Sequence, residues 1–209
     1  IPLADDATTL MVRETFARKL TQERSVLHIE CLSKEPAPEL SGDFVVNAFR
    51  RSLRFMRGSA KAFFDIVDAW VPFPNVFHEG NREQAASTLG IPDQLYNSGW
   101  WEVAADEALV LDLRPPDCRY WSLSLCDYWG ASFDYRYWNI HVNDQTACYR
   151  PDGSVRIVIA RRNPGLADTN WLDTAGHDRG VWTLRFLEAE GDHRPEVRRV
   201  AFEALDQLA

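Results

Sequence analysis

Hydrophobic residues in the first hundred positions recur three or four residues apart, which is the spacing of one face of an α-helix. This spacing runs from Asp5 to Leu32, again from Asp43 to Trp70, and over a shorter stretch from Asn81 to Leu89. Prolines in the segment 34–38 separate the first two stretches, because proline cannot continue a helix. Gly90 suits the position just past a helix end. The pattern therefore predicts a helical N-terminal part.

Beyond Trp100 the period changes to two, which is typical of β-strands. Strands are expected at residues 109–113, 120–125, 155–159 and 181–187. The segment 150–154 predicts a hairpin turn between residues 146–149 and the strand that follows, with Gly153 at a positive φ. The tail from Pro195 to Leu208 fits either a strand or a terminal helix.

Helices followed by hairpin-connected strands predict the α+β class. We expect a helical part over residues 1–99, packed on an antiparallel, sandwich-like β part over residues 100–209. The two parts form either separate domains or one continuous unit. A chain of 209 residues is long enough to bury a sizeable core.

The net charge of −8 repels phosphate backbones and anionic lipid surfaces, so nucleic acid is not an expected partner. No apolar run approaches the ~20 residues of a membrane-spanning helix, which predicts a soluble protein without a membrane span. The four cysteines show no metal-ligand spacing, so we expect no metal site and free thiols in a cytoplasmic protein, with a disulfide as the alternative. The chain opens on Ile1 rather than Met, and we expect processing or trimming upstream of it.

Familiar catalytic motifs are missing from the sequence. It contains no GxSxG nucleophile turn, no phosphate-binding glycine loop and no GxGxxG after a strand. ATP and NAD chemistry are therefore disfavoured, and no cofactor is expected. The chain is instead rich in tryptophan, and seven of its eight indoles lie from Trp100 onwards. Most of them should be core residues, with a few lining a pocket.

The densest group of polar and aromatic residues lies between residues 127 and 143. If residues 135–143 form a strand, alternate side chains share one polar and aromatic face, on which His141 is the group with a pKa near neutrality. The candidate ligand-binding residues here are Tyr137, Asn139, Asn143, Trp129 and Trp138, and the candidate acid–base residue is His141. The alternative is an ordinary solvated face of a sheet.

A second group lies in the loops between residues 161 and 180. Imidazole beside carboxylate is suited to proton transfer, which makes Asp173, His177 and Asp178 candidate catalytic residues. Asn170, Trp171 and Arg179 are candidate ligand-binding residues in the same loops. The alternative is that these polar side chains bond local backbone and that the indole anchors the loop.

Four segments together carry a resemblance to a known family. They are Arg119–Asp127 (RYWSLSLCD), the turn Asp152–Ser154, Asn163–Gly165 and Asn170–Asp173. In this order they resemble the bacterial family catalogued as domain of unknown function 1214, over roughly Trp100 to Phe202. The resemblance implies a β-rich, jelly-roll-like domain in proteins that sometimes carry a second uncharacterised domain. It implies no agreed activity, cofactor or catalytic residue.

Aromatic density without a catalytic signature favours a protein that binds a small, partly apolar ligand, such as a lipid, an isoprenoid or a sugar ring. Whether the protein is an enzyme stays open. The alternative is a cofactor-independent hydrolase, lyase or isomerase that uses His141 or His177 with Asp173 or Asp178. A third interpretation is a homo-oligomer whose exposed aromatic residues form the interface.

Overall fold

The structure is a computed structural model that describes residues 10–18, 21–30, 32, 40–80 and 93–208. Contacts along the chain divide it into two units, residues 1–39 and residues 40–209. The predictions for residues 34–38 and for Asn81 to Leu89 lie outside the described residues.

The helix predicted from Asp5 to Leu32 is wrong for the described residues of the first unit, which are extended or bent there. Val12, Val26 and Leu27 are 54%, 99% and 63% exposed. A helix gains most of its stability in a protein from packing its apolar face. Since these side chains remain exposed, nothing offsets the entropy lost in forming the helix.

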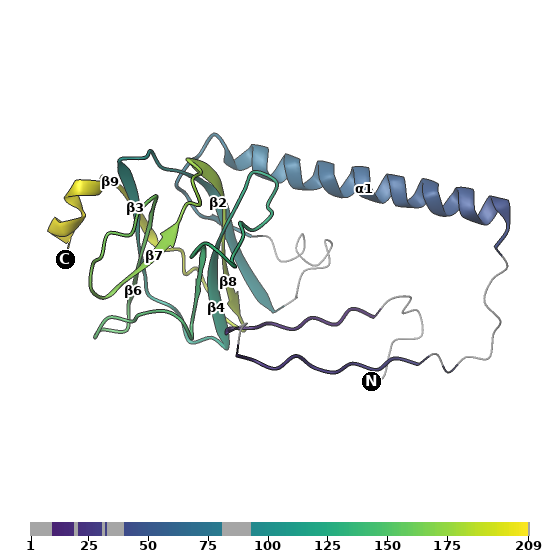
Figure 1. The fold of residues 1–209 in the computed structure, drawn as a ribbon, viewed down its shortest axis with the longest axis horizontal. Helices are drawn as coiled ribbons and strands as arrows, with labels where there is room; N and C mark the ends of the chain where they lie inside the picture. The colour runs from purple at the N-terminus through teal and green to yellow at the C-terminus, as the bar shows by residue number, and fades with distance from the viewer. Residues whose placement is uncertain (1–9, 19–20, 31, 33–39, 81–92, 209) are drawn as a thin grey trace. The chain divides into compact units, whose positions relative to one another are not determined.

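The second unit contains one long helix, α1 (Gly42–Trp70), and two packed sheets (Figure 1). The first sheet has the order β1 (His78–Glu79), β2 (Gln94–Glu102), β8 (Arg179–Leu187), β4 (Tyr120–Cys126) and β5 (His141–Asn143). The second has the order β7 (Thr169–Asp173), β6 (Val155–Ala160), β3 (Glu107–Leu113) and β9 (Glu196–Ala201). Strand pairs are antiparallel apart from β6 with β7, which is parallel. The α+β prediction is confirmed.

The core lies between the sheets, where Trp101, Trp182 and Phe186 of the first sheet share a cluster with Leu111 and Ile157 of the second. The other face of β3 and β6 is also buried. The 3-10 helix η1 (Phe202–Leu208) places Leu205 against that face, which explains why the residues between the core positions are apolar too. The tail from Pro195 thus forms both of the structures that its pattern fits, a strand and then a helix.

The turn at residues 150–154 forms as predicted, with Gly153 at φ +79° and its N–H donating to the Arg150 carbonyl. The predicted hairpin does not form, because residues 146–149 form no strand and β6 pairs with β3 and β7 instead. The side chain of Asn170 accepts from the Cys148 N–H (2.7 Å) and donates to its carbonyl (2.9 Å). A side-chain amide therefore takes the backbone groups that a partner strand would have paired.

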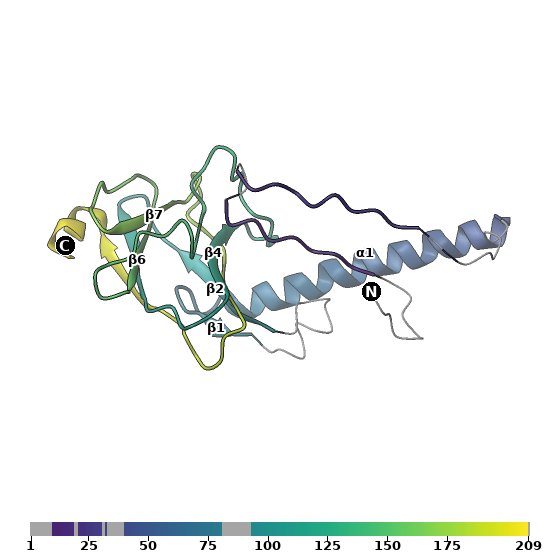
Figure 2. The same ribbon diagram turned by 90° about the horizontal axis from the view of Figure 1, so that it is seen from below.

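Helix α1 confirms the prediction for Asp43 to Trp70. The N-cap residue is Ser41, just before the helix, and its hydroxyl accepts a hydrogen bond from the Phe44 N–H at 3.1 Å. Its C-terminal end packs on β2 and β8, where Val67 and Trp70 contact a cluster containing Trp100 and Val181. The N-terminal turns extend beyond the sheets (Figures 1 and 2). The domain boundary predicted after residue 99 falls within β2, and the division into two domains stays a prediction.

One carboxylate ties three strands of the second sheet together. Asp112 on β3 accepts from Arg156 on β6 at 2.7 Å and from Arg198 on β9 at 2.6 Å. Partial burial alone would raise the pKa of Asp112, but the hydrogen bonds from the two guanidinium groups outweigh it and lower the pKa below its usual value. The ionised carboxylate is therefore part of the folded structure.

We expect Asp112→Asn to lower the free energy of unfolding by about 2 kcal/mol at neutral pH, the scale of hydrogen bonds to charged groups. A carboxyl with a lowered folded pKa stabilises the protein above its unfolded pKa, and this contribution is lost as pH falls through the folded pKa. Urea unfolding should thus show the two proteins converging below about pH 4. Asp65→Asn is the control, because its ion pair with Lys61 is exposed and lies within one helix. A difference that does not change with pH would contradict the ionic role.

Candidate functional site

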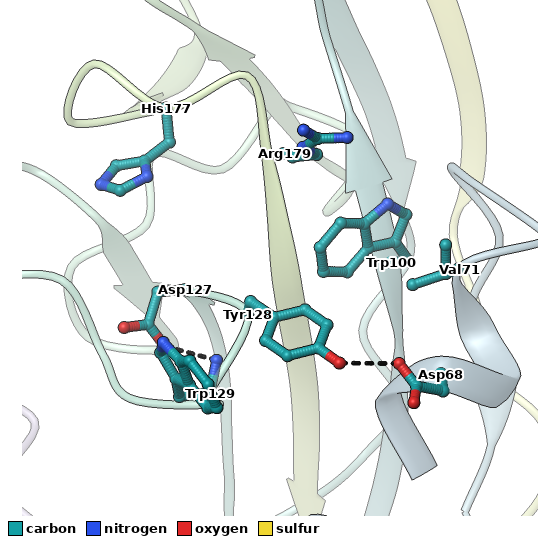
Figure 3. A pocket seen from close by; sticks show the side chains of 8 residues that line it. All are labelled: Asp68, Val71, Trp100, Asp127, Tyr128, Trp129, His177 and Arg179. Carbon is teal, nitrogen blue, oxygen red and sulfur yellow. Dashed lines mark hydrogen bonds between the residues drawn. The ribbon is translucent and has the colours of Figure 1, made fainter. Parts of the chain in front are cut away.

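A pocket of about 570 Å³ lies where the end of α1 meets the ends of β2, β4 and β8 (Figure 3). Its lining comes from four places in the sequence: Asp68 and Val71, Trp100, Asp127 to Trp129, and His177 with Arg179. Small-molecule pockets fall in the same range of volume. The fold thus brings residues from both parts of the chain to one hollow.

Strand alternation places Trp100 in this pocket. Neighbouring side chains of β2 point to opposite faces of the sheet. Trp101 is fully buried in the core between the sheets, whereas Trp100 lies on the other face, beneath α1 and 4% exposed. The Trp100 Nε1–H donates to the Glu102 carboxylate at 2.8 Å, which fixes the indole.

A tight turn after β4 presents the next two aromatic residues. The Asp127 carboxylate accepts from the N–H groups of Trp129 and Ala131, both at 2.9 Å, and Gly130 has φ +72°. An aspartate that bonds the backbone two residues on is typical of such turns. Tyr128 and Trp129 are therefore held at the mouth of the pocket by their own loop.

Four aromatic rings gather around these positions. Phe64 of α1 lies 4.8 Å from Trp129 and 6.1 Å from Tyr128, and Tyr128 lies 6.0 Å from Trp100, measured between ring centroids. The Tyr128 hydroxyl donates to Asp68 at 2.7 Å, and this hydrogen bond raises the pKa of the tyrosine. Trp129 remains 62% exposed. One side of the pocket is thus an aromatic surface joined to α1.

The basic groups lie at the opposite side, where Figure 3 shows His177 and Arg179 above the Tyr128 ring. No hydrogen bond or ion pair with the described residues engages the Arg179 guanidinium. The His177 imidazole stacks on Phe133 with a centroid distance of 4.4 Å. Asp178, between them in sequence, forms an ion pair with Arg161 instead. Arg179 therefore offers an unpaired positive charge to the pocket.

The strand predicted over residues 135–143 is wrong, and only His141–Asn143 are strand. The Asp134 carbonyl accepts from the Tyr137 and Trp138 N–H groups, so this segment turns instead of extending. The proposed face therefore does not form: Tyr137 is 78% exposed, Trp138 is 45% exposed, and Asn143 is 1% exposed. The Asn143 side chain accepts from the backbone of its own turn, at Gln145 and Thr146.

A second hollow of about 330 Å³ contains four of the remaining candidates, Asn139, His141, Asn170 and Trp171. These residues come from both sequence groups. Their polar atoms largely bond backbone: Asn139 donates to the Trp171 carbonyl at 2.5 Å, and the Trp171 indole donates to the Ala160 carbonyl at 3.0 Å. Burial lowers the pKa of His141. These contacts favour the structural interpretation of this group.

The candidate acid–base residues do not form one constellation. His177 lines the first pocket and His141 the second. Asp173 is 8% exposed, accepts from the Ala175 N–H at 2.8 Å, and has its pKa raised by burial. Among the described residues, no hydrogen bond joins either imidazole to a carboxylate. A His–Asp pair ready for proton transfer is thus not assembled there.

Sequence reasoning identified Trp129, His177 and Arg179 but did not select Asp68, Val71, Trp100, Asp127 or Tyr128 as site residues. The adjacent Trp100–Trp101 and the Asp127–Trp129 segment were visible signals of an aromatic site. Nothing in the sequence pointed to Asp68, because its position depends on how α1 docks. In the described part of the chain, no three His, Cys, Asp or Glu side chains are grouped to hold a metal ion, and no helix is long and apolar enough to cross a membrane.

Comparison with known proteins finds a match to the family model described as a protein of unknown function (DUF1214), over residues 93–191. The crystal structure of an uncharacterised protein from Burkholderia cenocepacia is similar, with 35% identity and a TM-score of 0.76. That match covers 82% of this chain and 47% of the other, so this chain spans about half the length of its relative. A protein from Vibrio parahaemolyticus shows 18% identity and a TM-score of 0.46, over 56% of this chain and 34% of the other. No curated protein matches the chain.

Proposed function

We propose, for this chain whose residues 93–191 match the DUF1214 family of unknown function, that the protein binds a small, partly apolar ligand with an acidic group in the pocket at the end of α1. A lipid, an isoprenoid or a sugar ring that carries a carboxylate or phosphate fits this description. The observation that carries the proposal is the guanidinium of Arg179, unpaired among the described residues, in one pocket with the exposed indole of Trp129.

The aromatic side of the pocket supplies the apolar contact. Trp129 is more than half exposed although it packs edge-on against Phe64 and Tyr128. An indole held in place by its neighbours loses little conformational entropy when a ligand covers it, so stacking on it is favourable. A ring or an alkyl chain lying on Trp129 would remove this apolar surface from water.

The polar groups of the pocket select the charge of the ligand. The carboxylates of Asp68 and Asp127 already accept hydrogen bonds from Tyr128 and from backbone N–H groups. Arg179 retains its donors, and a guanidinium binds a carboxylate or phosphate through two parallel hydrogen bonds. The pocket therefore combines an aromatic surface with a site for an anion.

The alternative of a hydrolase, lyase or isomerase has no hydrogen-bonded His–Asp pair to rest on among the described residues. His177 does line the pocket. Its ring stacks on Phe133, which favours a role in shaping the wall beside Arg179.

Paired probes that differ only in the acidic group test the proposal. We expect 2-naphthoate and dodecanoate to raise the melting temperature and to change tryptophan fluorescence, and 2-naphthylmethanol and dodecanol to bind more weakly. Arg179→Gln should weaken binding of the acids about tenfold, the scale of one hydrogen bond to a charged group, and leave the alcohols unchanged. Trp129→Ala should weaken acids and alcohols alike.

Arg119→Gln is the matched control, since it makes the same change outside the pocket lining, at a residue that pairs with Glu188. It should bind the acids as the wild type does. Equal binding of acids and alcohols, or unchanged acid binding by Arg179→Gln, would disprove the anion site. No binding of any probe, with the protein folded, would count against the pocket itself.

A further inference from the structure

Much of α1 displays apolar side chains that none of the described residues covers. Val67 is its buried residue, close to the end that contacts the sandwich. The exposed large residues are Phe44, Val45, Val46, Phe49, Leu53, Phe55, Met56 and Phe63, with exposed fractions from 39% to 72%. At 3.6 residues per turn they span about half of the helix circumference. Apolar patches of this extent on a protein surface mark an interaction site.

The opposite side of the same turns is a stripe of cations. Arg50, Arg54, Arg57 and Lys61 follow one another at intervals of four, three and four residues, so they line one face. Arg51 adds a fifth positive charge, and the segment 44–64 contains no acidic residue. The whole chain has a net charge of −8, so the remainder without these five cations carries −13. The excess of positive over negative charge is therefore a feature of this helix segment and not of the chain as a whole.

The width of the apolar arc and the positive charge of the opposite side decide which kind of partner fits this helix. A helix that docks in a protein groove uses a narrow row of anchors at every third or fourth residue. A second copy of α1 packed on the apolar arc would leave both stripes of cations facing outwards without an anionic partner. An amphipathic helix with phenylalanine and leucine on one face and arginine on the other is typical of segments that lie in a membrane interface.

We propose that residues 44–64 of α1 bind the surface of a membrane that contains anionic lipids. The apolar arc lies at the boundary of headgroups and acyl chains, and the arginines contact lipid phosphates. The negative charge of the remaining chain does not prevent this, because screening at physiological salt limits its repulsion to about 8 Å. None of residues 44–64 is in the pocket lining, so the two proposals are tested by different measurements.

Sedimentation with lipid vesicles tests this assignment. The full chain should sediment with vesicles of 30% phosphatidylglycerol in phosphatidylcholine and much less with pure phosphatidylcholine, and raised salt should release it. Arg50→Gln with Arg54→Gln should weaken partitioning about fivefold for each cation removed. Phe49→Ser with Phe55→Ser should weaken it about tenfold or more. Both phenylalanines are 72% exposed, so the fold should survive, as far-UV circular dichroism will check.

Arg114→Gln with Arg119→Gln is the matched control, because it removes two exposed cations from the sandwich. It should partition as the wild type does. Three outcomes would overturn the proposal: no sedimentation with the anionic vesicles, equal sedimentation with both vesicle types, or an equal loss in the control. A dimer by light scattering that the phenylalanine variant dissociates, without vesicle binding, would assign the face to a second copy.

Discussion

Replacing Trp101 by Ala is expected to lower the free energy of unfolding by about 4 kcal/mol, the scale of a buried tryptophan truncation. Trp101 is fully buried between the sheets, and it packs edge-on against Phe133. Its Nε1–H has no hydrogen-bond partner in the described part of the structure, so the loss is one of packing and not of a polar contact. Urea unfolding followed by circular dichroism measures the change.

Trp129→Ala is the control for this truncation, since it removes the same atoms from a 62% exposed position. Its effect on stability should stay within about 0.5 kcal/mol. The two variants thus separate indoles that hold the sandwich together from one that faces a ligand. Equal destabilisation by both variants would show that the aromatic cluster at the pocket belongs to the core.

Alternation predicted strands at residues 109–113 and 120–125, which lie in β3 and β4 as expected. Both faces of these strands are largely buried, so alternation detected the two-residue spacing of large apolar side chains and not a contrast in burial. It failed at residues 135–143, where the Asp134 carbonyl and the ion pair of Asp134 with Arg136 favour a turn. The alternation of apolar and polar residues carries no information about such local hydrogen bonds, which compete directly with strand pairing.

The helices show a similar limit. Apolar residues recur four apart at Val12, Phe16 and Leu20, as they do in α1, yet the described residues of that first stretch form no helix. The spacing predicts which side of a helix would be apolar, but not whether other residues pack against that side. In α1 the last turns dock on β2 and β8, which gives the helix an anchored end.

Part of the candidate site was predictable for a specific reason. Trp129, His177 and Arg179 stood out as aromatic or ionisable residues in loops, and the antiparallel pairing of β4 with β8 brings their two segments together. Which of Trp100 and Trp101 faces the pocket depends on the register of β2, and the presence of Asp68 depends on the docking of α1. Neither of these can be derived from residue types alone.

Gly180→Ala is expected to lower the free energy of unfolding by about 3 kcal/mol, as overpacking of a filled site does. A Cβ on Gly180 would lie 2.2 Å from the Cys126 carbonyl oxygen and 3.1 Å from the Trp101 indole. The carbonyl cannot move without disturbing the pairing of Cys126 with Val181 between β4 and β8. Glycine is thus required here by the close approach of two strands and not by its φ angle.

The same substitution should also weaken ligand binding, because Gly180 follows Arg179 in β8 and the displaced Cys126 precedes the Asp127 turn. Gly58→Ala is the matched control: it adds one methyl group in open space within α1 and should stabilise the helix by about 1 kcal/mol at most. Urea unfolding and 2-naphthoate titration of both variants measure the two effects. A Gly180→Ala protein as stable as the wild type would show that β4 and β8 separate more easily than their pairing implies, and the pocket wall would then be adjustable.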